Sequence, residues 1–167
     1  VAVTNTPDVL TDEVADLAMG LMLAALRGIA TADRYVRAGL WLRANMPLQT
    51  RMSGKRLGIV GRGRICQAIG KRATAFDMSI AWNGPRPKEL PWRYESDLLA
   101  LARSVDVLVA ACPGGAATRG LISRAVLEAL GPGVFVSIAR GSVVDETALV
   151  DLAARKIVDY ARTHNCS

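Results

Sequence analysis

A glycine-containing turn after an apolar run is the segment whose residue types and spacing most clearly indicate chemistry. Gly61 and Gly63 follow the run Leu57 to Val60, and a helical pattern follows them. In such a turn the first glycine permits a tight bend, and the second lets the backbone approach a pyrophosphate at the amino end of the helix. Cys66 holds the third position, where glycine ordinarily lets helix and strand pack closely, so we expect a modest packing penalty and a shifted helix. The spacing therefore predicts a dinucleotide-binding turn.

The end of the next apolar run, Met78 to Trp82, bears on which dinucleotide the turn accepts. About 20 residues beyond the turn, an Asp or Glu would bind the ribose 2′-hydroxyl of NAD. The sequence instead has Asn83, Arg86 and Lys88. Without an acid there is no repulsion of a 2′-phosphate, and a guanidinium can hold that phosphate through two hydrogen bonds. We therefore expect NADP in preference to NAD, although a purely surface role for Arg86 in its Pro-rich loop stays open.

Alternating strand and helix patterns position both groups of residues. Short apolar runs predict four strands, at 55–60, 78–82, 105–111 and 134–138, and a short strand at 1–3 precedes them. Helical periodicity predicts helices at 67–76, 98–103, 124–130 and 145–154, with Ser123 capping the third and Asp145 opening the fourth. This alternation is typical of an α/β fold with a doubly wound parallel sheet and right-handed crossovers.

A long helix is predicted before this alternation. It begins at Thr11, whose hydroxyl we expect to cap the free amides, and Asp12 and Glu13 lie where the macrodipole favours carboxylates. Apolar residues then recur at helical spacing, and the helix runs on toward Val36 with only Gly28 interrupting it. Its apolar content indicates packing against a sheet or a second subunit.

The composition is that of one soluble domain. The chain has 167 residues, of which 51% are hydrophobic, 22% charged and 5% aromatic, so its core is built mainly from aliphatic side chains. The most apolar segment, Leu17 to Leu26, is shorter than the roughly 20 residues that span a bilayer. With no signal-peptide pattern at its start, the chain is expected to be cytoplasmic and free of membranes. Three cysteines without paired spacing indicate no disulfide framework and no metal site.

The net charge of +6 raises the question of an anionic partner. Basic residues are scattered from Arg27 to Arg162, and no aromatic residues interleave with them as in single-strand binding proteins. A solvated basic surface or an anionic small-molecule ligand accounts for this charge, and we expect no nucleic-acid partner.

Four stretches, spread in order over most of the chain, carry a resemblance to one family. They are residues 5–16, residues 58–65, Cys112-Pro113 with residues 118–121, and residues 139–146. They resemble the D-isomer-specific 2-hydroxyacid dehydrogenases, in particular the glyoxylate/hydroxypyruvate reductases. The resemblance implies a Rossmann-type NAD(P)-binding domain over residues 1–154, incomplete at its C-terminal end, with a divergent tail at 155–167 and the substrate domain absent. It also implies an NAD(P)-dependent oxidoreductase that reduces 2-keto acids and forms homodimers.

The resemblance assigns roles to individual residues by position. Those expected at the cofactor's pyrophosphate are Gly61, Gly63, Arg64 and Ile65. Those expected at the adenosine ribose or its phosphate are Asn83 and Arg86. Those expected to line the cofactor cleft, with the last near the nicotinamide, are Cys112, Pro113, Thr118 and Ala139. Arg140 matches the family's catalytic arginine, which binds the substrate carboxylate and polarises the keto group, and a guanidinium at the end of a strand suits both tasks.

The sequence also departs from the family at its C-terminal end. The glycine-rich strand carrying the family's Glu does not appear, and neither does the motif of its general-acid His. His164 is the only histidine, and its surroundings favour a frayed tail residue. We therefore expect little turnover from this chain alone. A catalytically inactive, truncated paralogue that only binds nucleotide, or dimerises through its first helix, is the alternative.

Overall fold

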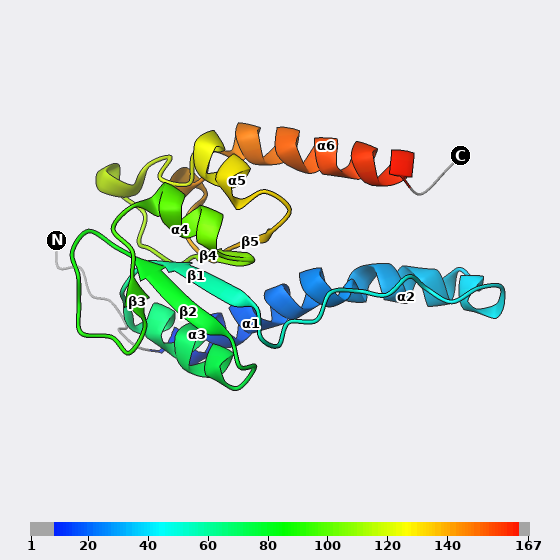
Figure 1. The fold of residues 1–167 in the computed structure, drawn as a ribbon, viewed down its shortest axis with the longest axis horizontal. Helices are drawn as coiled ribbons and strands as arrows, with labels where there is room; N and C mark the ends of the chain where they lie inside the picture. Colours follow the sequence, from blue (N-terminus) through cyan, green and yellow to red (C-terminus); the bar gives the residue numbers. More distant parts are fainter. Residues whose placement is uncertain (1–8, 164–167) are drawn as a thin grey trace, which may run out of the picture.

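Short, buried runs of aliphatic residues form a parallel five-stranded sheet in the computed structural model, which describes residues 9–163 (Figure 1). Its strands are β1 (Arg56–Val60), β2 (Ser79–Asn83), β3 (Arg93–Tyr94), β4 (Val107–Ala110) and β5 (Val134–Ser137), in the order β3-β2-β1-β4-β5. The four strands predicted at 55–60, 78–82, 105–111 and 134–138 are confirmed. The two-residue strand β3, at the sheet edge beside β2, was not predicted.

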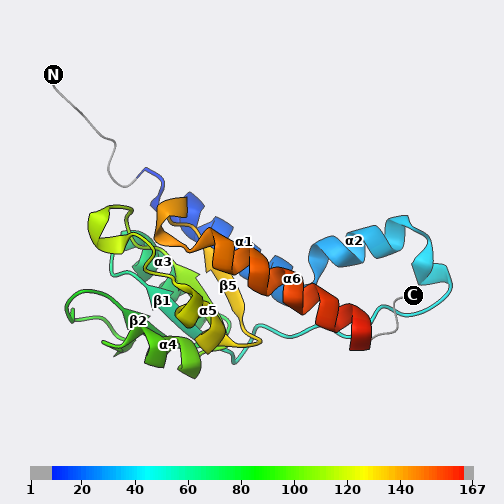
Figure 2. The same ribbon diagram turned by 90° about the horizontal axis from the view of Figure 1, so that it is seen from above.

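Helices cover both faces of the sheet, as expected for a doubly wound fold (Figures 1 and 2). On one face lie α1 (Thr11–Arg27) and α3 (Arg64–Thr74), and on the other lie α4 (Leu98–Ser104), α5 (Arg124–Leu130) and α6 (Glu146–Thr163). Because parallel strands with such crossovers point the same way, the carboxyl ends of β1, β2, β4 and β5 meet at one edge of the sheet. The predicted site residues follow these ends.

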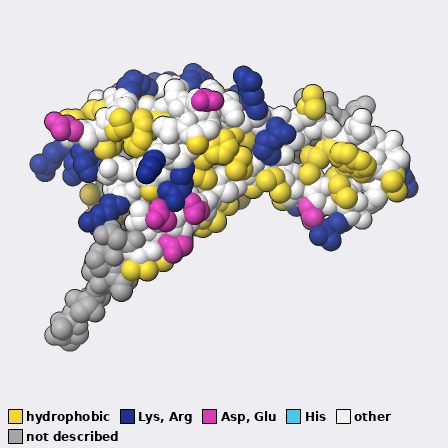
Figure 3. All heavy atoms as spheres, turned by 90° about the horizontal axis from the view of Figure 1, so that it is seen from below, with side chains coloured by type: hydrophobic (Ala, Val, Ile, Leu, Met, Phe, Trp, Pro, Cys, Tyr) yellow, Lys and Arg dark blue, Asp and Glu magenta, His cyan; other side chains and the backbone are white. Residues whose placement is uncertain are grey.

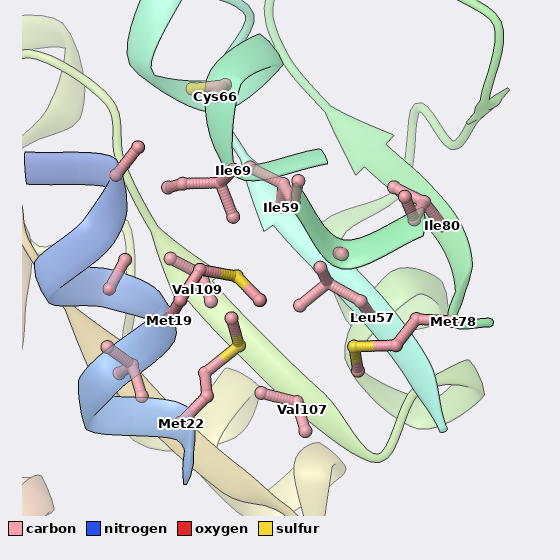
Figure 4. Close-up of a cluster of buried hydrophobic side chains, with 14 of the residues drawn as sticks. Met19, Met22, Leu57, Ile59, Cys66, Ile69, Met78, Ile80, Val107 and Val109 are labelled. Carbon is pink, nitrogen blue, oxygen red and sulfur yellow. The ribbon is translucent and has the colours of Figure 1, made fainter. Parts of the chain in front are cut away.

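The core consists of two clusters, one on each side of the sheet, and β1 contributes to both. Leu57 and Ile59 face α1 and α3, where Met19 and Met22 of α1 pack against them (Figure 4). Gly58 faces α4, and a Cβ placed on it would lie 3.3 Å from Leu101 Cγ of that helix. The alternation along β1 therefore fixes which face each helix covers, and the missing side chain at Gly58 lets α4 lie close to the strand.

A helical arm projects from the sheet domain. Gly28, with a φ of 60°, ends α1, and α2 (Ile29–Arg37) continues at an angle of 57° before a 3-10 helix, η1 (Leu40–Leu42). The arm keeps apolar side chains in solvent, visible as yellow surface on the lobe at the right of Figure 3. In the described part of the chain no single helix is long and apolar enough to cross a membrane, although α1 and α2 taken as a bent pair meet both criteria.

Several expected helix boundaries were wrong in detail. Thr11 is the first residue of α1 and makes no capping bond, because Leu10 occupies the cap position. Ser123 stands at the cap of α5 but likewise makes no side-chain bond, whereas Asp145 Oδ1 accepts from Ala148 N at 2.9 Å and caps α6. Helix α6 continues to Thr163 instead of ending at 154, so the expected domain boundary falls within a helix. The strand predicted at residues 1–3 and His164 lie outside the described residues.

Candidate functional site

The glycine turn links the end of β1 to the first turn of α3, and its two glycines are used differently. Gly61 has a φ of 137°, and a Cβ on it would lie 2.6 Å from Cys66 Sγ and 3.0 Å from the carbonyl oxygen of Ala111. Its amide donates to Asn83 O at 2.8 Å, which ties the turn to the end of β2. Gly63 has an ordinary φ of −77°, and no atom lies within 4 Å of a Cβ placed there. Conformation and crowding thus require glycine at 61, while Gly63 leaves open space in front of a helix amino end.

Cys66, at the third glycine position, is packed inside the helix that follows the turn. Helix α3 starts at Arg64, and the Cys66 side chain is buried within its first turn. Its thiol donates to the carbonyl oxygen of Ala111 at 3.4 Å. Burial raises the pKa of this thiol to about 11, so it stays protonated at neutral pH. The expected packing penalty is offset by a hydrogen bond that glycine lacks.

A cleft of about 730 Å³ opens in front of this turn at the carboxyl edge of the sheet. The predicted site residues that line it are Gly63, Arg64, Ile65, Cys112, Pro113, Ala139 and Arg140. They come from three separate segments, which follow β1, β4 and β5. The fold therefore brings the glycine turn and the Ala139-Arg140 pair into one cavity, because the carboxyl ends of β1, β4 and β5 meet at the same edge of the sheet.

The loop after β4 closes on itself and carries one wall of the cleft. Thr118 does not line the cavity, but its hydroxyl donates to Pro113 O at 2.7 Å and so fixes the loop that bears Pro113. Next to Pro113, a Cβ on Gly114 would lie 2.7 Å from Cγ and 3.0 Å from Cβ of Arg140. Because those atoms are near the Arg140 backbone, any larger residue at 114 would displace the whole arginine side chain rather than its tip. Gly114 thus makes room for the arginine at the cleft.

The end of β2 is arranged differently from the sequence-based expectation. Asn83 is buried, and its Nδ2 donates to Glu95 O at 2.8 Å and Ser96 O at 3.1 Å, so this amide nitrogen holds the following loop. Arg86 is exposed in that loop. Arg62, which we did not predict, has its Cδ 3.7 Å from the position of a Cβ on Gly84. Arg62 therefore lies beside the end of β2, where a ribose substituent would lie, and Arg86 follows in the exposed loop three residues after Asn83.

The residues of this edge fit a bound dinucleotide. The open space at Gly63 lies in front of α3, whose first-turn amides point toward an approaching anion. Cleft residues that sequence reasoning missed are Leu10, Thr11 and Val14 at the start of α1, and Ala111, Gly114 and Ile138 beside the predicted residues. From the sequence, the start of α1 was interpreted as a capped helix end and as part of a stretch that resembles the family, without a role in the site. Its place in the cleft follows from contacts between α1 and α3. Among residues 9–163 no group of three or more His, Cys, Asp or Glu side chains is placed to hold a metal ion.

Comparison with known proteins agrees with this geometry. Residues 19–163 match the family model described as "D-isomer specific 2-hydroxyacid dehydrogenase, NAD binding domain". The chain belongs to the D-isomer specific 2-hydroxyacid dehydrogenase family. The resemblance and the Rossmann-type NAD-binding fold expected from the sequence are both confirmed.

Similar proteins are reductases and dehydrogenases about twice as long. The chain is 50% identical over 152 residues to hydroxyphenylpyruvate reductase of Plectranthus scutellarioides, covering 90% of this chain and 49% of that protein. It is 47% identical, with the same coverage, to a glyoxylate/hydroxypyruvate reductase of Arabidopsis thaliana. Among solved structures, the chain is similar to an NADPH-dependent glyoxylate/hydroxypyruvate reductase of Sinorhizobium meliloti in complex with NADP and malonate. The two structures superpose with a TM-score of 0.85 at 45% identity, and the match covers 90% of this chain and 49% of that one. The chain thus spans about half the length of the relatives it matches.

Proposed function

We propose that this chain is the nucleotide-binding part of an NADP-preferring reductase of 2-keto acids. The observation that supports it is the single cleft, at the carboxyl edge of the sheet, that both the glycine turn and Arg140 line. Relatives are named as reductases of glyoxylate, hydroxypyruvate, hydroxyphenylpyruvate and 2-ketogluconate. Each of these substrates carries a carbonyl group beside a carboxylate, and 2-oxo acids of this kind are the substrate class we assign here.

The chain's residues divide the work of binding and orientation. The amino end of α3, at Gly63, Arg64 and Ile65, holds the pyrophosphate, and Ala139 borders the nicotinamide end of the cleft. A bound nicotinamide cofactor supplies the hydride. Arg140 binds the substrate carboxylate and draws charge toward the keto oxygen as that oxygen becomes negative. A proton must also reach that oxygen, and the only histidine, His164, lies outside the described residues.

The preference for NADP rests on the basic residues at the end of β2. Neither residue 83 nor its neighbours up to Lys88 is an acid, Arg62 lies beside Gly84, and Arg86 follows in the same exposed loop. A 2′-phosphate placed there would gain charge-assisted hydrogen bonds, whereas the ribose hydroxyl of NAD would find no carboxylate acceptor.

The test is a titration of the chain with NADPH and NADH, followed by nicotinamide fluorescence. We expect NADPH to bind more tightly, and Arg86→Gln to weaken NADPH binding about tenfold while leaving NADH binding unchanged. Arg103→Gln removes the same charge from the opposite edge of the sheet and serves as the control. Failure to bind either dinucleotide would overturn the proposed function, and equal affinity for both would overturn only the NADP preference.

Turnover is a separate question from binding. We expect the chain alone to oxidise NADPH in the presence of glyoxylate or hydroxypyruvate far more slowly than a complete reductase, because its described part lacks a histidine to protonate the keto oxygen. The alternative of an inactive chain that only binds nucleotide or dimerises makes the same prediction for this polypeptide. A longer coding sequence supplying the acid and the substrate domain distinguishes the two by restoring turnover. Normal reductase rates from this chain would contradict both expectations.

A further inference from the structure

Cys66 lies at the meeting point of three segments that build the cleft. Figure 4 shows it at the end of the buried cluster, beyond Ile69 of the same helix. Its sulfur fills the space that a Cβ on Gly61 would enter, and its thiol donates to Ala111 O. The turn after β1, the first turn of α3 and the end of β4 are therefore in contact through this one side chain.

The hydrogen bond between Cys66 and Ala111 joins two of the three segments that line the cleft. Helix α3 presents Gly63, Arg64 and Ile65 on one side, and Ala111 leads directly into Cys112 and Pro113 on the other. The amide of Ala111 donates to Val60 O at 2.9 Å, so the backbone at Ala111 is held from β1 by its N–H and from α3 by its carbonyl. A dinucleotide lying in the cleft would contact both walls at once, which makes their separation matter for affinity.

The protonation state of the Cys66 thiol suits a hydrogen-bond donor. Burial raises its pKa to about 11, so the sulfur carries its proton and remains a donor at neutral pH. The same burial makes it a poor nucleophile, because the reactive thiolate is scarce. Cys112, which lines the cleft, also has a pKa raised by burial. Neither cysteine is arranged for covalent chemistry, and the structural contact is what distinguishes Cys66.

We propose that Cys66 is a positioning residue for the cofactor, whose S–H bond to Ala111 O sets the separation between the phosphate-binding turn and the Cys112-Pro113 wall. The inference rests on the proposed function, since it concerns the same cleft. A third glycine ordinarily lets helix and strand approach closely. In this chain, a hydrogen bond from Cys66 to the Cys112-Pro113 wall takes the place of that role. The thiol acts through its neighbours and does not touch the cofactor.

A pair of variants of similar size separates the hydrogen bond from packing. Cys66→Ser keeps a donor facing Ala111 O, which a shift of less than about 1 Å brings into hydrogen-bond range, and Cys66→Ala keeps none. We expect the Kd for NADPH to rise about fivefold in Cys66→Ala, the effect of losing one hydrogen bond, and to stay within about twofold of the wild type in Cys66→Ser. Binding is measured by nicotinamide fluorescence well below the melting temperature of each variant, so that all of the protein is folded.

Ile69→Val is the matched control, because Ile69 is buried in the same helix but does not line the cleft. It should lower the melting temperature without changing the Kd, and a rise in Kd equal to that of Cys66→Ala would overturn the proposal by showing that loss of stability alone weakens binding. Equal Kd values for the wild type and Cys66→Ala would also overturn it. If Cys66→Ala does not fold, Cys66→Val, which fills the buried space but has no donor, gives the same comparison. A wild-type chain that binds no dinucleotide refutes the proposed function itself, which is a distinguishable result.

Discussion

Gly61 and Gly63 meet two different requirements of the same turn, and alanine at each position should separate stability from binding. At Gly61 a side chain would adopt a strained φ and collide with Cys66 Sγ and Ala111 O, so Gly61→Ala should lower the free energy of unfolding by about 1–3 kcal/mol. At Gly63 the backbone is ordinary and the space is open, so Gly63→Ala should fold with nearly unchanged stability. Its Cβ would project into the space assigned to the pyrophosphate and weaken NADPH binding.

Thermal unfolding and NADPH titration of the two variants check this prediction. Gly63→Ala should show a wild-type melting temperature and a raised Kd, while Gly61→Ala should show a lowered melting temperature. A Gly63→Ala variant that binds as the wild type does would mean that the pyrophosphate does not approach this glycine.

At the residue scale, spacing alone predicted the glycine turn, because the requirement for glycine comes from local backbone geometry. The arginine at the cleft could be assigned only through family resemblance, since a lone Arg140 after a strand is ambiguous. The structural bonds of Asn83 and the thiol contact of Cys66 were not predictable. Their acceptors follow 12 and 13 residues later for Asn83, and 45 residues later for Cys66, at places that only the folded chain brings near.

At the scale of elements, two helical glycines should respond in opposite directions to alanine. Gly20 in α1 is exposed, and no atom lies within 4 Å of a Cβ placed on it, so Gly20→Ala should stabilise the protein by up to about 1 kcal/mol. Gly70 in α3 is buried against the ring of Trp92, into which a Cβ would project, so Gly70→Ala should destabilise it by about 1–3 kcal/mol. Urea unfolding of both variants measures the difference, and a stabilising Gly70→Ala would show that Trp92 does not pack there.

The link between β1 and β4 should make stability depend on acid. The Asp106 carboxylate accepts three hydrogen bonds from Arg56: from Nη2 at 2.8 Å, from Nε at 3.1 Å and from the backbone N at 2.8 Å. The hydrogen bond from the Arg56 side chain lowers the pKa of Asp106 from its usual 3.8 to about 2. A carboxyl with a lower pKa in the folded state stabilises the protein above its unfolded pKa, and this contribution is lost as the pH falls toward the folded value.

Melting temperatures of the wild type and Asp106→Asn between about pH 6 and pH 2 test this link. The difference should be constant at the upper end and shrink below about pH 4, because there the carboxyl of the unfolded chain takes up a proton while the folded one stays charged until the pH nears 2. Asp33→Asn is the control, because Asp33 pairs with Arg37 on the exposed surface of α2, where such pairs contribute little. A difference that persists unchanged to pH 2 would contradict a pH-dependent role for the Asp106 charge.

Most elements of the sheet domain were predictable because each of the four longer strands is a short apolar run and each helix has apolar residues at helical spacing. Strand β3 was missed since two residues carry no periodicity; it is held by pairing with β2 and by Tyr94, whose ring lies 4.7 Å from that of Trp82. The bend at Gly28 was also missed. Helical spacing continues through it, and only the left-handed backbone of this glycine, covered by Gln49, turns α2 away from α1.

At the scale of the whole molecule, the arm is the feature that the sheet domain does not explain. No residue of α2 or η1 is buried, and Leu42 and Trp41 are 90% and 58% exposed. Solvent-exposed side chains of this size on a projecting arm are typical of a surface that is covered by a partner. We propose a second copy of this chain as that partner, which agrees with the homodimer expected from the sequence.

This proposal predicts that the arm controls the oligomeric state. The wild-type chain should elute at twice its monomer mass of 17.8 kDa in light scattering coupled to size exclusion, and Leu42→Asp should elute as the monomer. A buried, unpaired carboxylate in an apolar interface is strongly unfavourable, whereas on a free monomer the same aspartate is solvated at little cost. Val150→Asp places the same charge on an exposed apolar residue of α6 and should leave the dimer intact. A monomeric wild type, or a Leu42→Asp variant that remains dimeric with an unchanged dissociation constant, would rule out the arm as the contact between subunits.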